Sequence, residues 1–118
     1  MTQVVHTMHV GGNELNPFKC SIGDDVFYGT SELHHSELNA VMNYTGDCRV
    51  LITNAEPCPM CMAAIIWSGK IDTVIYNVDI PTLMNLGWKQ SSIRAADVIK
   101  SFNSDIEIIQ ADIMEFKL

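Results

Sequence analysis

Two short motifs hold the residues whose types and spacing could carry out chemistry. The first spans residues 35–37 (His-Ser-Glu), and the second spans residues 56–61 (Glu-Pro-Cys-Pro-Met-Cys). One imidazole and two thiolates are ligands that zinc binds well. A catalytic zinc site takes three protein ligands and leaves its fourth position to water or substrate. We therefore predict that His35, Cys58 and Cys61 hold one Zn²⁺ per chain.

The cysteine pair is expected at the start of a helix. Pro59 suits a first helical turn, where its missing N–H is not needed. A spacing of three residues along that turn brings both sulfurs to one side. Thiolates are also favoured at this end of a helix, where free N–H groups and the helix dipole stabilise negative charge.

Glu37 is the predicted catalytic residue. It lies two residues after His35, where a chain entering a helix lets both side chains reach one cavity. Zinc lowers the pKa of a bound water from 15.7 to roughly 7, and a carboxylate beside that water can accept its proton and pass it on. The H-x-E spacing selects His35 as the ligand in place of the adjacent His34.

The helices and strands that must position these motifs are predicted from hydrophobic periodicity and from the Gly and Pro residues that interrupt it. Strands are expected over 18–22, 26–28, 50–53, 73–78 and 106–109, and helices over about 36–44, 59–68, 81–86 and 93–102. Residues 2–10 are weakly periodic and predict a short helix. Strands alternate with helices from residue 36 onward, which favours an α/β sheet covered by helices, with parallel pairing in the second half.

Together the two motifs resemble the cytidine and deoxycytidylate deaminase superfamily. The resemblance is carried by residues 35–41 (His-Ser-Glu-Leu-Asn-Ala-Val) and 53–65 (Thr-Asn-Ala-Glu-Pro-Cys-Pro-Met-Cys-Met-Ala-Ala-Ile), and is clear over residues 17–78. H-x-E followed by P-C-x-x-C is the signature of zinc-dependent nucleobase deaminases. The closest similarity is to the branch of guanine, cytosine and tRNA adenosine deaminases.

The resemblance implies a three-layer α/β/α fold with a mixed five-stranded central sheet. It also implies that Glu37 protonates a ring nitrogen of the substrate and then helps to expel ammonia. The substrate, a small amino-heterocycle of guanine or cytosine type, would be contacted near Ser36 and Pro57, with His34 lining the pocket and Trp88 stacking on a flat ring. The resemblance further implies a homodimer formed through the helix over 60–67.

The chain also differs from its relatives. Many of them carry a longer loop before the metal-binding histidine, with an Asn that reads the base. Here residues 28–34 (Tyr-Gly-Thr-Ser-Glu-Leu-His) lead directly into His35, and that Asn has no counterpart. The difference leaves the substrate open and keeps a zinc-stabilised binding module without turnover as an alternative function.

Composition limits the other possibilities. A length of 118 residues predicts one domain over 1–118. A formal net charge of −7 with scattered Lys and Arg makes nucleic acid an unlikely partner, which ranks editing of tRNA adenosine below a small-molecule reaction. Neither a signal-peptide pattern nor a membrane-spanning apolar run is present, so we expect a cytoplasmic protein.

Two other interpretations of the cysteine pair remain open. Cys58 and Cys61 could form a redox pair, or half of a structural zinc site closed by a fourth ligand. Cys20, Cys48, His6 and His9 offer no ligand spacing for such a site. Glu56 is expected to orient the loop or the helix start next to it through its charge.

Overall fold

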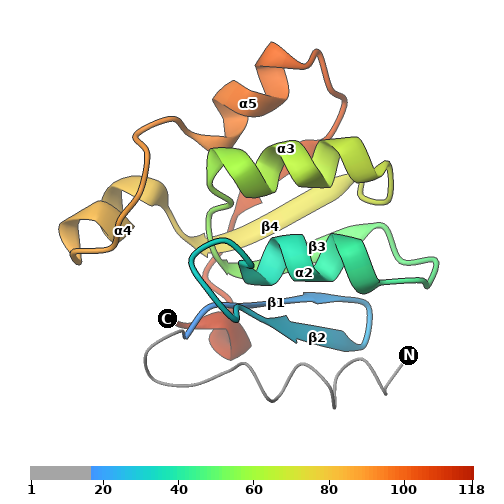
Figure 1. Ribbon diagram of the computed structural model, residues 1–118, viewed down its shortest axis with the longest axis horizontal. Coiled ribbons are helices and arrows are strands. Elements are labelled where there is room, and N and C mark those ends of the chain that lie inside the picture. The colour runs from blue at the N-terminus through green and yellow to red at the C-terminus, as the bar shows by residue number, and fades with distance from the viewer. Residues whose placement is uncertain (1–16) are drawn as a thin grey trace.

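The computed structural model describes residues 17–118. These residues form a single mixed sheet with helices packed against it (Figure 1). The expected α/β fold with five strands is confirmed. The helix expected over residues 2–10 lies outside the described residues. The five strands are β1 (Lys19–Ile22), β2 (Asp25–Tyr28), β3 (Val50–Ala55), β4 (Thr73–Val78) and β5 (Glu107–Gln110).

The sheet has the order β2-β1-β3-β4-β5. β1 pairs antiparallel with both β2 and β3, whereas β3 with β4 and β4 with β5 pair parallel. Parallel pairing in the second half is therefore confirmed. Because β3 and β4 are parallel and are joined by a helix, their carboxyl ends lie at the same edge of the sheet, and loops that follow them meet there.

The helices lie close to the predicted bounds. They are α2 (Ser36–Asn43), α3 (Pro59–Ser68), α4 (Ile80–Asn85), α5 (Ala95–Ser101) and a short 3₁₀ helix, η1 (Met114–Phe116). The helix expected from residue 93 begins two residues later. There the backbone N–H of Arg94 donates to the carboxylate of Asp97, which caps the helix start.

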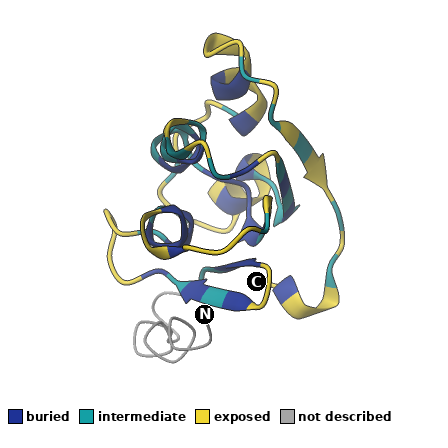
Figure 2. Ribbon diagram, turned by 90° about the vertical axis from the view of Figure 1, so that its right-hand side faces the viewer, coloured by how far each residue is buried: buried dark blue, intermediate teal, exposed yellow. Residues whose placement is uncertain are grey.

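The core fills the space between one face of the sheet and helices α2 and α3. Side chains alternate between the two faces of a strand. The inward face of the sheet carries Cys20, Ile22, Phe27, Leu51 and Val74, all fully buried. The inward sides of α2 and α3 are likewise buried, whereas β5 at the sheet edge is largely exposed (Figure 2).

The 3₁₀ helix packs on the opposite face of the sheet. Its residue Phe116 is buried and accepts a hydrogen bond through its carbonyl from the amide of Asn77, while the ammonium of Lys19 lies 5.3 Å from its ring centroid. Asn77 and Lys19 alternate with core-facing strand residues, which places η1 on the other side from α2 and α3. Among residues 17–118, no helix is both long and apolar enough to cross a bilayer.

Candidate metal centre and its cavity

Each predicted metal ligand lies at the start of a helix. His35 directly precedes α2, Cys58 directly precedes α3, and Cys61 is in the first turn of α3. His35 and Cys58 have extended backbones, with ψ of 162° and 169°, before the chain turns into its helix. Pro59 is the first residue of α3, as its fixed φ favours. Gly69, in the left-handed conformation at φ 66°, ends this helix.

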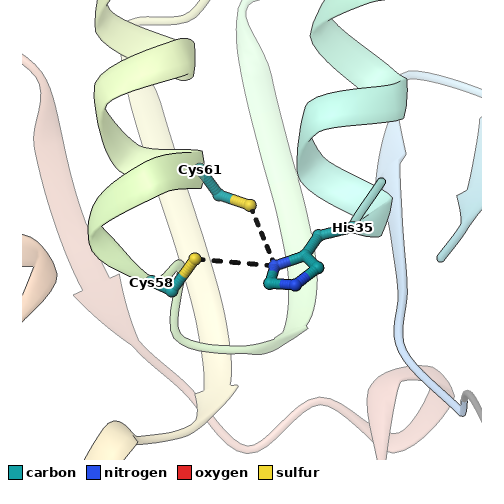
Figure 3. Close-up of side chains that lie close together, drawn as sticks. All are labelled: His35, Cys58 and Cys61. Atoms are coloured by element: carbon teal, nitrogen blue, oxygen red, sulfur yellow. Dashed lines mark hydrogen bonds between the residues drawn. The ribbon is translucent and has the colours of Figure 1, made fainter. Parts of the chain in front are cut away.

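The three ligand atoms form a compact group, which we call the metal cradle (His35, Cys58 and Cys61). The imidazole Nδ1 lies 3.5 Å from Sγ of Cys58 and 3.3 Å from Sγ of Cys61 (Figure 3). All three atoms lie within 4.8 Å of one another. Tetrahedral zinc with bonds of about 2.3 Å to sulfur and 2.05 Å to nitrogen separates such atoms by roughly 3.6 Å. The cradle therefore fits this metal.

The two thiols of the cradle have opposite tendencies to ionise. A hydrogen bond from the Cys61 thiol lowers the pKa of Cys58 to about 4. The same hydrogen bond, together with burial, raises the pKa of Cys61 well above its ordinary value. A hydrogen bond to Cys58 raises the pKa of His35. Without metal, the cradle thus holds one thiolate and retains protons that a metal must displace.

Glu37 is buried beside the cradle. Its side chain is 5% exposed, and one carboxylate oxygen accepts a 2.9 Å hydrogen bond from the hydroxyl of Ser36. Burial raises the pKa of Glu37, because removal from water disfavours the charged carboxylate. The carboxylate is thus fixed in orientation by Ser36, and its raised pKa makes it hold a proton more readily than an exposed glutamate does.

A cavity of about 720 Å³ opens over the cradle. Its lining includes His35, Glu37 and Cys58 from the two motifs. Much of the opposite side comes from residues 86–93, which we call the wall segment, through Trp88, Lys89, Gln90, Ser91 and Ile93. Phe18, before β1, also lines the cavity and packs edge-on against Trp88 with ring centroids 4.7 Å apart.

The residues predicted to contact substrate lie in different places. Trp88 lines the cavity. Ser36 and Pro57 are fully buried next to the cradle residues and do not belong to the cavity lining, although their neighbours do. His34 is exposed and also lies outside the lining; its ring contacts the hydroxyl of Ser31. The substrate contacts of all four residues stay predictions.

Several residues at the cavity were not predicted from the sequence. Phe18, Ser31, Glu32 and Gln90 line it, yet none of them belongs to a motif. Ser31 and Glu32 carried a local signal, because both lie in the loop of residues 28–34 that leads into His35. The buried carboxylate of Glu56, for which an orienting role was predicted, forms an ion pair with the partly exposed side chain of Arg94, at an Nε–Oε1 distance of 3.0 Å.

Solved structures of similar fold include guanine deaminase from Nitrosomonas europaea, which is 18% identical, has a TM-score of 0.63, and is matched over 92% of this chain and 73% of its own. The protein NE0047 in complex with 2,6-diaminopurine is 18% identical with a TM-score of 0.65, over 98% of this chain and 74% of that one. Its complex with 8-azaguanine gives 19% identity and a TM-score of 0.63, over 92% and 73%. These likenesses establish the fold.

The sequence itself gives the family. No curated protein matches the chain. Residues 4–78, more than half of the chain, match the cytidine and deoxycytidylate deaminase zinc-binding region. This match includes both motifs and all three residues of the cradle. With the fold in agreement, the chain belongs to the cytidine and deoxycytidylate deaminase superfamily.

Proposed function

We propose that this chain is a single-domain, zinc-dependent deaminase that hydrolyses an exocyclic amine of a nucleobase, nucleoside or related amino-heterocycle and releases ammonia. The observation that carries the proposal is the shared cavity. The buried carboxylate of Glu37 and two residues of the metal cradle, His35 and Cys58, line the same space of about 720 Å³. Cavities of this size accommodate small-molecule ligands.

His35, Cys58 and Cys61 would hold the metal. A bound Zn²⁺ supplies Lewis acidity and makes water a good nucleophile near neutral pH. The cradle contributes three ligand atoms, and no fourth His, Cys, Asp or Glu joins it among residues 17–118. Three protein ligands are typical of a catalytic zinc site, because a structural site is closed by a fourth.

Glu37 would carry the protons. The overall reaction adds one water to the ring carbon, breaks its bond to the exocyclic nitrogen, and yields a carbonyl and ammonia. Glu37 accepts a proton from the attacking water, delivers it to the adjacent ring nitrogen, and then assists protonation of the leaving amine. The Ser36 hydroxyl fixes the carboxylate orientation through its 2.9 Å hydrogen bond.

The charges in the cavity favour a substrate without phosphate. Glu32 and Glu37 contribute two carboxylates to the lining, against one ammonium from Lys89, while the charge of the third carboxylate, Glu56, is balanced by its ion pair with Arg94. A phosphate group would meet net repulsion there, whereas an uncharged or weakly basic ring would not. Trp88 and Phe18 offer aromatic surface to such a ring.

Ligands of the related structures support a guanine-type substrate over a cytosine-type one. The neighbour NE0047 is described in complex with 8-azaguanine and with 2,6-diaminopurine, both flat amino-heterocycles. We propose the same ligand class for this chain. A homodimer formed through α3 and a cytoplasmic location remain predictions from the sequence.

The direct test is ammonia release by the zinc-loaded protein. The panel comprises guanine, cytosine, isocytosine, adenine, their nucleosides and pterins. We expect turnover of at least one free base or nucleoside. Glu37→Gln should lower kcat by about 10³-fold or more, because the proton carrier is lost, while zinc content stays near one per chain. Glu107→Gln, on the exposed edge strand β5, is the matched control and should retain full activity.

The same preparation separates the alternatives. Retained activity in Glu37→Gln would contradict the assigned proton transfer. No turnover of any panel compound, combined with tight, salt-sensitive binding of tRNA, would favour RNA editing. No turnover and no RNA binding, with one firmly held zinc, would instead favour a non-catalytic binding module.

A further inference from the structure

The carboxylate of Glu56 gathers donors from a distant part of the chain. Its side chain is 1% exposed. Oε1 accepts a 2.9 Å hydrogen bond from the backbone N–H of Ile80, and Oε2 accepts one of 2.8 Å from that of Ala95. Nε of Arg94 lies 3.0 Å from both oxygens. All of these partners belong to residues 80–95, which contain the wall segment.

The two backbone donors lie at the beginnings of helices. Ile80 is the first residue of α4 and Ala95 is the first residue of α5. Such N–H groups have no acceptor within their own helix and need one from elsewhere. By satisfying both, Glu56 holds the two ends of residues 80–95 next to each other. It also holds them against the loop that leads to Cys58, two residues further along the chain.

Between these two ends, the wall segment has little other support. The N–H groups of Leu86, Gly87 and Trp88 donate to carbonyls of the last turn of α4, so the first part of the segment follows that helix. Beyond Trp88, the N–H of Ile93 donates to the hydroxyl of Ser91. Most of its residues are exposed. The edge-on contact with Phe18 is its link to the rest of the cavity. Its position therefore depends on its ends, which the hydrogen bonds to Glu56 fix together with the buried side chains of Ile80 and Ala95.

Glu56 also lines the cavity, so a role as a second proton carrier must be considered. Its hydrogen bonds argue against that role. Two backbone amides and a guanidinium donate to its two oxygens, so both oxygens are already occupied by fixed donors. A group held in this way binds and orients better than it exchanges protons, in contrast to Glu37.

We propose that Glu56, paired with Arg94, is a positioning residue that holds the wall segment over the metal cradle and thereby sets the affinity for substrate. The proposal rests on the deaminase function proposed above. Loss of the Glu56 contacts releases both ends of residues 80–95 and leaves the cradle in place. The effect is thus expected on KM, with kcat nearly unchanged.

The chain contains a matched control pair. Arg49 and Asp72 form an ion pair of the same chemistry, with Nε–Oδ2 at 2.7 Å and a second bond of 2.8 Å to Oδ1. Their side chains are 51% and 64% exposed, and neither residue lines the cavity over the cradle. A variant of this pair loses an arginine–carboxylate contact without touching the wall segment.

The experiment compares zinc-loaded Glu56→Gln, Arg94→Met and Asp72→Asn with the parent chain. Glu56→Gln should raise KM by roughly tenfold and change kcat by less than about threefold, because its amide places a donor against donors. Arg94→Met should act in the same direction with a smaller effect. Asp72→Asn should match the parent. Hydrogen exchange should accelerate over residues 86–93 in Glu56→Gln and stay unchanged over α3.

Three outcomes would overturn the proposal: a large fall in kcat at constant KM, kinetics equal to the parent, or exchange that accelerates over α3 as much as over the wall segment. If Glu56→Gln fails to fold, Arg94→Met decides, since it leaves both backbone contacts of Glu56 in place. If the parent releases no ammonia from any panel compound, the proposed deaminase function fails. The hydrogen-exchange measurement alone then tests whether Glu56 holds the wall segment in place.

Discussion

The two sides of the cavity are built in different ways. The metal cradle takes its residues from the starts of α2 and α3, with His35 and Cys58 directly before these helices and Cys61 in the first turn of α3. The two helices have eight and ten residues and pack on the sheet. The wall segment is an exposed stretch between two shorter helices, fixed mainly at its ends. The difference indicates that the groups proposed for chemistry lie on the stable part of the molecule, and the groups proposed to select substrate lie on a more easily altered part.

The largest effects are expected on the cradle side. Cys58→Ser removes one of three ligands, so zinc content should fall from one per chain to near zero and activity to below about a thousandth of the parent. The protein should also lose the stability linked to metal binding, about 4 kcal/mol when free zinc exceeds its Kd a thousandfold. Metal analysis and thermal unfolding measure both effects.

Cys48→Ser is the control for that variant. Cys48 is half-buried and its thiol donates to the carbonyl of Val50, away from the cradle. It should keep zinc, activity and melting temperature close to the parent values. Loss of zinc in this variant as well would contradict the assignment of the ligands.

The second-largest effect is expected on the pH dependence of zinc affinity, which the cradle alone determines. In the metal-free protein, Cys58 has a pKa of about 4, because the Cys61 thiol donates to it, and is ionised at neutral pH. Cys61 has a raised pKa, mainly through the same hydrogen bond, and keeps its proton. Zinc must displace at least that proton. Since the complex holds fewer protons, raising the pH favours it, by about tenfold in affinity per unit.

Competition with a chelator between pH 6 and pH 8 measures this dependence. A Kd that tightens at least tenfold per pH unit is expected for the parent chain. A Kd independent of pH would mean that both thiols are already ionised, and would contradict the unequal ionisation of the pair. Wall-segment variants should show the same slope as the parent, which separates the two sides of the cavity.

The smallest effect is expected at the wall. Trp88→Ala removes aromatic surface from the cavity and should raise KM by about tenfold, the value of one ring-stacking contact, with kcat within roughly twofold. Leu86→Ala changes an exposed residue of the same segment that does not line the cavity, and should leave both constants unchanged. Equal effects of the two substitutions would show that the wall responds to general loosening and makes no direct contact.

The sequence predicted the cradle well because its information is local. The spacing of His35 and Glu37, the spacing of the cysteines, and Pro59 at a helix start are all set within a few residues. The strands were predictable for the same reason, since β4 begins with the β-branched run Thr73, Val74 and Ile75 followed by Tyr76. The ends of the elements differ from the prediction, as at the start of α5, where the side chain of Asp97 accepts from the N–H of Arg94 and caps the helix.

The contacts of the wall segment could not be predicted from the sequence, because they join residues that are far apart along the chain. Arg94 lies 38 positions from Glu56, and Phe18 is separated by most of the chain from Trp88. No periodicity or spacing in the sequence encodes such pairs. An arginine outside any motif, such as Arg94, is common on exposed protein surfaces. Glu56 carried a signal only through its place beside the cysteine motif.

One consequence follows from the way a single carboxylate holds both ends of residues 80–95. A segment closed at its base can gain or lose residues in its middle without displacing either end, since added loop length costs little free energy. Insertions between Gly87 and Ile93 should therefore reshape the mouth of the cavity while the zinc ligands keep their geometry. For protein engineering, residues 87–93 can therefore be varied in length and sequence to select new substrate preferences, while the zinc ligands and Glu37 are left unchanged.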